Sequence, residues 1–183
     1  MSQTIIDAIY KDFADLAIFL QKAGEVSLLT VVDSTFKKTL AISAASFFED
    51  KIRRILLETV TERSANDKLI HNFIKNKAIE RQYHTYFQWR GKNANSFFGL
   101  FGEAFRDSAI RDINGDENLS DSITAFLELG NTRNELAHLN FASFALDMTT
   151  GEVYQKYKKA LLFVNYLEGK LKKFGTKKED HSI

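Results

Sequence analysis

The sequence contains no cysteine and no proline. The absence of cysteine excludes disulfides, thiolate nucleophiles and cysteine-based zinc or iron–sulfur sites, and it agrees with a cytoplasmic location. No apolar run is long enough to cross a bilayer, and the most apolar early stretch, 26–32, is interrupted by Ser27 and Thr30. The first residues also lack the basic and apolar regions of a signal peptide. We therefore expect a cytoplasmic protein without a membrane-spanning segment.

An excess of charge of one sign is missing too, because 25 basic and 24 acidic residues leave a net charge of +1. A protein whose whole surface wraps nucleic acid is usually far more basic. Any contact with RNA must therefore be local, in a cleft. The hydrophobic share of 44% and the 183-residue length fit one globular domain with a substantial core.

Apolar residues recur at helical spacing along most of the chain. The spacing predicts helices over about 5–22, 28–61, 66–80 and 95–113, a helix that begins near Ser120 or Asp121 and includes His138, and a last helix over about 153–171. The segment 28–61 exceeds the usual length of a helix, which leaves room for a kink or break at 43–46. No alternating strand, internal repeat or interdomain linker is visible. We expect an all-α fold: a single domain over 1–183, built as an antiparallel bundle of about five to six helices, with a polar, frayed tail after about residue 174.

Three residues late in the chain form a pattern that suits RNA chemistry. Asn134 and His138 are four residues apart and share one face of a helix, while Arg133 has a side chain long enough to reach the same cleft. Histidine can transfer the protons that internal cleavage of RNA requires, and a guanidinium can stabilise the charge on phosphate oxygens. Arginine and histidine are also common as surface or capping residues of a bundle helix, so the spacing alone leaves the function open.

A single histidine cannot act as base and as acid in the same step. A symmetric dimer that brings two such segments together would supply both groups, one from each protomer. The chemistry therefore predicts a homodimer and requires no metal ion.

The segment from Arg133 to His138 resembles the Arg-x4–6-His signature of HEPN domains, and an asparagine directly after the arginine is the form found in their ribonuclease members. Two further segments, Tyr86–Trp89 and Asn93–Gly102, resemble the RiboL-PSP-HEPN branch. With the segment Phe47–Ile52, the likeness extends from about residue 40 to about residue 171.

The resemblance implies a helical bundle that often forms homodimers and that, in its active members, is a metal-independent endoribonuclease of toxin, anti-phage or RNA-processing systems. By position, Arg133 and His138 inherit the catalytic roles, Asn134 a supporting role, and Glu49 an outer supporting acidic role. It also implies RNA as the partner, with an antitoxin or another defence-locus protein as a further partner. Some relatives keep the fold without cleaving RNA, so a non-catalytic module that binds nucleotide, RNA or protein is the alternative. A helical domain with no role in nucleic-acid binding is a third.

Other residues carry weaker signals. Trp89, Arg90 and Lys92 combine an aromatic ring with two cations, which can bind single-stranded RNA; we assign Trp89 to the core and keep Arg90 and Lys92 as RNA-binding candidates. His84 lies near Arg81 and Tyr83, which could stack on a base, but we interpret it as a partly buried histidine between helices. Histidine spacing does not suit a zinc site, and 112–123 lacks the glycine and glutamate of a calcium loop, so we expect no metal and no cofactor.

Overall fold

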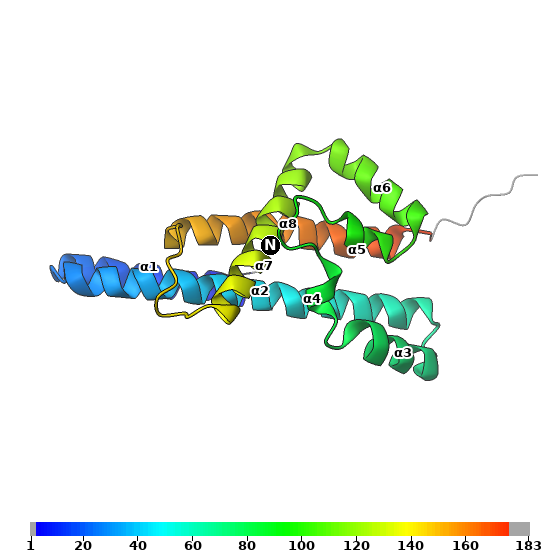
Figure 1. The fold of residues 1–183 in the computed structure, drawn as a ribbon, viewed down its shortest axis with the longest axis horizontal. Coiled ribbons are helices and arrows are strands. Elements are labelled where there is room, and N and C mark those ends of the chain that lie inside the picture. The colour runs from blue at the N-terminus through cyan, green and yellow to red at the C-terminus, as the bar shows by residue number, and fades with distance from the viewer. Residues whose placement is uncertain (1–2, 176–183) are drawn as a thin grey trace, which may run out of the picture.

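A computed structural model describes residues 3–175, and this part of the chain is helical without any strand (Figure 1). Its elements in chain order are α1 (Ile5–Lys22), α2 (Val26–Arg63), α3 (Lys68–Ile74), the π-helix η1 (Lys75–Ile79), α4 (Tyr83–Tyr86), α5 (Asn95–Gly99), α6 (Glu103–Asn114), α7 (Glu117–His138) and α8 (Thr150–Lys173). The predicted all-α fold is confirmed, although the segments 66–80 and 95–113 each divide into shorter helices than the spacing predicted. Most of the expected frayed tail, 176–183, lies outside the described residues.

Three long helices form the centre of the molecule. Figure 1 shows α2 and α8 running lengthwise beside each other while α7 crosses them, and all three pack against one another. The helix α1 lies along the first half of α2, and α3 lies beside its end. Contacts with both α2 and α8 fix the orientation of α7. This orientation determines which part of the molecule its C-terminal turns face.

Aromatic rings join these three helices in the core. Phe126 of α7 lies with its ring centroid 5.7 Å from Phe48 of α2 and 5.0 Å from Phe163 of α8. The ring of Phe48 also packs 5.4 Å from that of Tyr157 on α8. All four side chains are at most 1% exposed, so each contributes a large apolar area to the core.

The helix α2 is continuous, without the break that its length allowed at 43–46. Ala41, Ala44 and Ala45 are buried there, and Phe48 follows one turn later. Small side chains let neighbouring helices approach the backbone closely, and alanine is the best helix former. The core therefore covers α2 at the position where the prediction left room for a break.

Two predicted helices are interrupted. The segment 95–113 divides into α5 and α6 because Gly102 adopts φ +94°, a conformation that favours glycine and cannot continue a helix. The adjacent rings of Phe97 and Phe98, in α5 just before the break, are both fully buried. The segment 66–80 becomes α3 followed by η1, and the chain leaves η1 through Arg81 at φ +61°.

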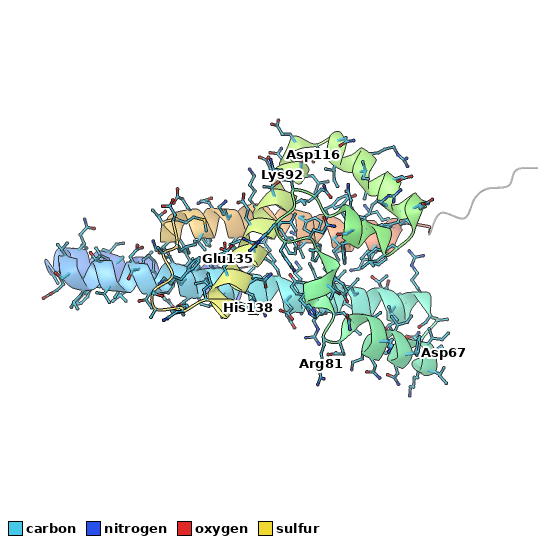
Figure 2. The ribbon with its side chains drawn as sticks, viewed as in Figure 1. Asp67, Arg81, Lys92, Asp116, Glu135 and His138 are labelled. Atoms are coloured by element: carbon cyan, nitrogen blue, oxygen red, sulfur yellow. The ribbon has the colours of Figure 1, made fainter. Side chains whose placement is uncertain are left out.

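Side-chain caps fix where several helices begin. Asp67 accepts hydrogen bonds from the amides of Leu69 and Ile70 at the start of α3, and Asp116 does the same at the start of α7 (Figure 2). Thr149 and Glu152 form a reciprocal capping box that starts α8 at Thr150, earlier than predicted. These polar capping residues precede the apolar pattern, so α7 and α8 both begin earlier than the pattern predicted.

Replacing Phe163 by alanine removes a ring that contacts Phe126, Phe98 and Phe87 in the core. We expect the free energy of unfolding to fall by about 3–5 kcal/mol. The matched control is Leu162→Ala at the neighbouring position, which is 43% exposed and should change stability by less than about 1 kcal/mol. Urea denaturation measures both, and equal losses would contradict the assigned core.

Candidate functional site

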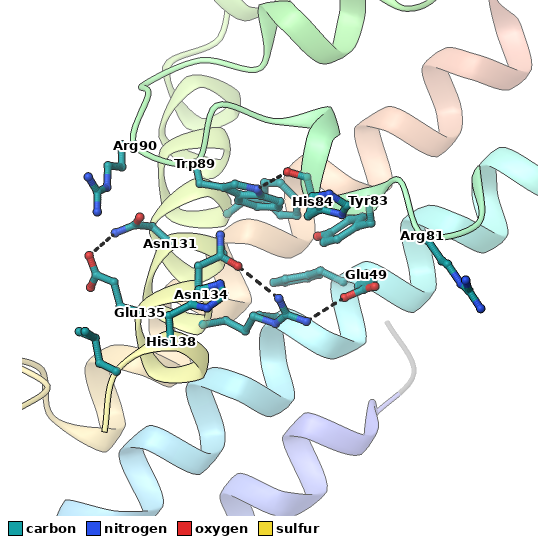
Figure 3. Close-up of a pocket in the computed structure, with 16 residues that line it drawn as sticks. Glu49, Arg81, Tyr83, His84, Trp89, Arg90, Asn131, Asn134, Glu135 and His138 are labelled. Carbon is teal, nitrogen blue, oxygen red and sulfur yellow. Dashed lines mark hydrogen bonds and ion pairs between the residues drawn. The ribbon is translucent and has the colours of Figure 1, made fainter. Parts of the chain in front are cut away.

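A cavity of about 820 Å³ lies where the end of α7 faces the middle of α2 and the segment 81–90 (Figure 3). Its volume is in the range of small-ligand sites. One side is formed by α7, a second by α2, and the third by the irregular chain around α4. The polar and charged residues that line it are Glu49, Arg81, Tyr83, His84, Arg90, Asn131, Arg133, Asn134, Glu135 and His138.

The helix α7 supplies the largest share of these residues because of its periodicity. Leu129 and Leu136 are buried against the core, which turns the opposite face outward. Asn131, Asn134 and His138 follow at steps of three and four residues on that outward face, and all three line the cavity. His138 is the last residue of α7 and is exposed, so its imidazole is accessible to a ligand in the cavity.

Arg133 connects the motif to α2. Its Nη2 lies 3.6 Å from the Oε2 of Glu49, and its Nη1 donates a hydrogen bond of 3.2 Å to the side-chain oxygen of Asn134 (Figure 3). The side chains of Arg133 and Glu49 are 38% and 31% exposed, and partly exposed pairs of this kind contribute little to stability. The pair instead orients Arg133, because the carboxylate of Glu49 holds the guanidinium toward α2 within the cavity.

An aromatic wall stands opposite the motif; we use this name for Tyr83 and Trp89. Their ring centroids are 5.4 Å apart, and the Nε1 of Trp89 donates a hydrogen bond of 3.0 Å to the backbone oxygen of His84. Burial and the negative charge of Glu49 raise the pKa of Tyr83, with Arg133 acting in the opposite direction, so its hydroxyl stays protonated. The wall therefore presents rings and a neutral donor to the cavity.

The position of Trp89 depends on Gly130 of α7. A Cβ atom at Gly130 would lie 2.1 Å from Cζ3 of Trp89 and 2.2 Å from its Cε3. No flexible end of a side chain is available to move away, since these atoms belong to a rigid ring. Gly130 is thus the residue that lets the indole pack directly on the backbone of α7, beside Phe126.

The structure brings together most of the residues singled out from the sequence. Arg133, Asn134, His138 and Glu49 line one cavity, and Arg90 lies at its edge. Lys92 does not line it and instead borders an adjoining groove that Arg90 shares. Trp89 packs against the core, as assigned, and also lines the cavity.

Asn131 and Glu135 were not recognised from the sequence, Arg81 and Tyr83 were noted only as neighbours of His84 that could stack on a base, and His84 itself was misplaced. His84 was interpreted as partly buried between helices, but it lies exposed in α4 and lines the cavity. Tyr83 and Arg81 precede it in a segment with no periodic signal. Asn131 and Glu135 could have been found, since they share the outward face of α7 with His138 and are joined by a hydrogen bond of 3.0 Å.

The described residues hold no group of three or more histidine and carboxylate side chains that could bind a metal ion. No helix among them is both long enough and apolar enough to cross a membrane. The cavity itself offers arginine, histidine, amide, carboxylate and aromatic groups.

The all-helical fold, with arginine, asparagine and histidine at the end of one long helix, defines a HEPN domain. The chain belongs to the RiboL-PSP-HEPN family, whose sequence model matches residues 7–173. Comparison with curated proteins and with solved structures found no match. Membership places the chain among domains that are ribonucleases or nucleotide-binding modules and that commonly dimerise and bind RNA.

Replacing Gly130 by alanine should displace Trp89, the only tryptophan of the chain, from α7. We expect a shifted tryptophan emission maximum and a stability loss of about 1–3 kcal/mol. Gly169→Ala on α8 is the control, because its Cβ would meet nothing within 4 Å and alanine favours a helix. An unchanged emission spectrum in Gly130→Ala would show that the indole does not rest on Gly130.

Proposed function

We propose that this protein is a metal-independent endoribonuclease whose catalytic residues are Arg133 and His138. The observation that carries the proposal is their common cavity, in which Asn134 and Glu49 contact the arginine and His138 remains accessible. A structural arginine would normally be satisfied by neighbours that need not face a cavity. Here the guanidinium, the imidazole and the amide border the same open volume.

The proposed reaction is internal attack within RNA. The ribose 2′-oxygen attacks the adjacent phosphorus while the bond from phosphorus to the 5′-oxygen breaks. A base removes the proton of the 2′-hydroxyl, and an acid gives a proton to the departing 5′-oxygen. The products are a 2′,3′-cyclic phosphate and a 5′-hydroxyl. His138 carries one of these transfers, because an imidazole can accept a proton at one ring nitrogen or donate one from it.

The neighbours of His138 provide the electrostatic part. Arg133 stabilises the charge that builds on the phosphate oxygens, through hydrogen bonds from its planar guanidinium. Asn134 accepts from Arg133 through its oxygen, which leaves its amide nitrogen to donate to the phosphate. Glu49 orients Arg133 from α2 and takes no part in proton transfer. Arg90, at the edge of the cavity, and Lys92, in the adjoining groove, attract the flanking phosphates.

Replacing His138 by alanine should lower cleavage of a mixed RNA pool by a factor on the order of 10²–10⁴. The assay contains EDTA, and the wild-type protein should leave cyclic-phosphate ends. His71→Ala is the matched control, because His71 pairs with Thr61 away from the cavity and should leave cleavage unchanged. Cleavage by folded His138→Ala at the wild-type rate would rule out the proposed catalytic role.

A second proton-transfer group is needed, and we propose that His138 of a second copy supplies it in a homodimer. Leu139 follows His138, is 55% exposed and lines the same cavity. A second copy that packed on this end of α7 would cover Leu139 and bring its own His138 toward the same cavity. The proposal therefore places the dimer interface at the C-terminal end of α7.

Mixed dimers test the composite site. Dimers with one wild-type protomer and one His138→Ala protomer, isolated through two different tags, contain a single His138 per interface. A composite site predicts that their cleavage rate falls far below about half of the wild-type rate, whereas two independent sites predict about half. Sedimentation of the wild-type protein must first show a dimer, and a monomer at working concentration would contradict the arrangement.

The biological setting that we propose is a toxin or anti-phage defence system, with an antitoxin or another defence-locus protein as partner, by analogy with the family. The second candidate function is a non-catalytic module that binds nucleotide or RNA or docks to a protein. The cavity volume and its aromatic wall favour this candidate independently of His138. A folded, dimeric wild-type protein that leaves every tested RNA intact would make it the leading one.

A further inference from the structure

The aromatic wall has no role in the reaction described above. Tyr83 and Trp89 are only partly buried, although each packs against the core, and both line the cavity opposite Arg133 and Asn134. Rings that served the core alone would be covered by other side chains. Partly exposed rings that line a cavity of about 820 Å³ instead offer an apolar surface to a flat ligand.

The wall is held in place before any ligand arrives. Trp89 is fixed by its hydrogen bond to the His84 backbone and by its contact with Gly130. Tyr83 packs edge-on against Tyr86 and Phe87, which are both buried. A preorganised surface loses little conformational entropy on binding, so its contacts contribute more of their energy to affinity.

Hydrogen-bonding groups lie beside the rings. Asn131 donates to one carboxylate oxygen of Glu135 at 3.0 Å, which leaves the side-chain oxygen of Asn131 and the second oxygen of Glu135 as acceptors. The exposed imidazole of His84 borders the same cavity. A flat ring system with polar edges matches this combination, and in RNA that description fits an unpaired base.

We propose that the cavity binds one unpaired nucleobase against Tyr83 and Trp89 while the adjoining phosphate lies on Arg133 and His138, so that the substrate is single-stranded RNA. The proposal rests on the proposed function for the identity of the phosphate site. A base within a duplex has both faces stacked and its edge paired, and it would have to be extruded before it could enter.

Trp89 makes the test direct, because its emission is the only tryptophan signal of the chain. His138→Ala protein, which should not cut but keeps Arg133 and the aromatic wall, is titrated with a short single-stranded RNA, with the same strand in a duplex, with adenosine 3′-monophosphate and with ribose 5-phosphate. We expect the single strand to change the emission and to bind tighter than the duplex by a factor on the order of 10–100. Adenosine 3′-monophosphate should change the emission, and ribose 5-phosphate should not.

Two variants isolate the wall. Tyr83→Leu should weaken binding of the single strand roughly tenfold, the scale of one stacking contact. Phe19→Leu is the matched control on α1, where Phe19 is 67% exposed and far along the chain from the cavity, and it should bind normally. If Tyr83→Leu does not fold, the comparison of the base-bearing and base-free probes on the unaltered wall still decides the question.

Equal affinity for duplex and single strand, or the same emission change with ribose 5-phosphate, would overturn the nucleobase site. The endoribonuclease proposal fails separately. Base-selective binding without cleavage by the wild-type protein supports the nucleobase site and contradicts the enzyme. Cleavage that ignores strandedness, without any change in Trp89 emission, supports the enzyme and contradicts the nucleobase site.

Discussion

The packing of Phe126 between Phe48 and Phe163 is the interaction on which the other features of this protein depend. It holds α7 against α2 and α8 together, and it fixes the rotation of α7 about its own axis. A different rotation would bury Asn134 and expose Leu136, because residues two positions apart lie on nearly opposite faces of a helix. The core thus determines that the motif faces a cavity, and Phe48 and Phe126 themselves form part of its lining.

The energies of the site and of the fold are largely separate. Stability resides in fully buried rings, whereas the pair between Arg133 and Glu49 is partly exposed and contributes little to it. The pair can therefore be adjusted for function at small cost to the fold. Gly130 is the exception, because the close contact between its backbone and the ring of Trp89 both packs the indole and shapes the cavity.

Two halves of the cavity differ in chemistry. The α7 half carries the charged and amide groups that suit a phosphate, and the half formed by 83–89 carries rings that suit a base. A nucleotide has the same division between a charged end and a flat end. This correspondence unites the two proposals, although each has its own readout, one in bond cleavage and the other in the emission of a single tryptophan.

Local sequence determined the helical class and the motif face, because a 3.6-residue period places Asn134 and His138 together whatever surrounds the helix. The resemblance to a known family identified Glu49 from a distant part of the chain. Tertiary structure alone decided that Tyr83, His84 and Trp89 face this motif. Their approach requires the left-handed turn at Arg81 and the missing side chain at Gly130, and neither has a periodic signal. The break at Gly102, which follows the buried Phe97 and Phe98, likewise lies in a segment whose own spacing favours one helix.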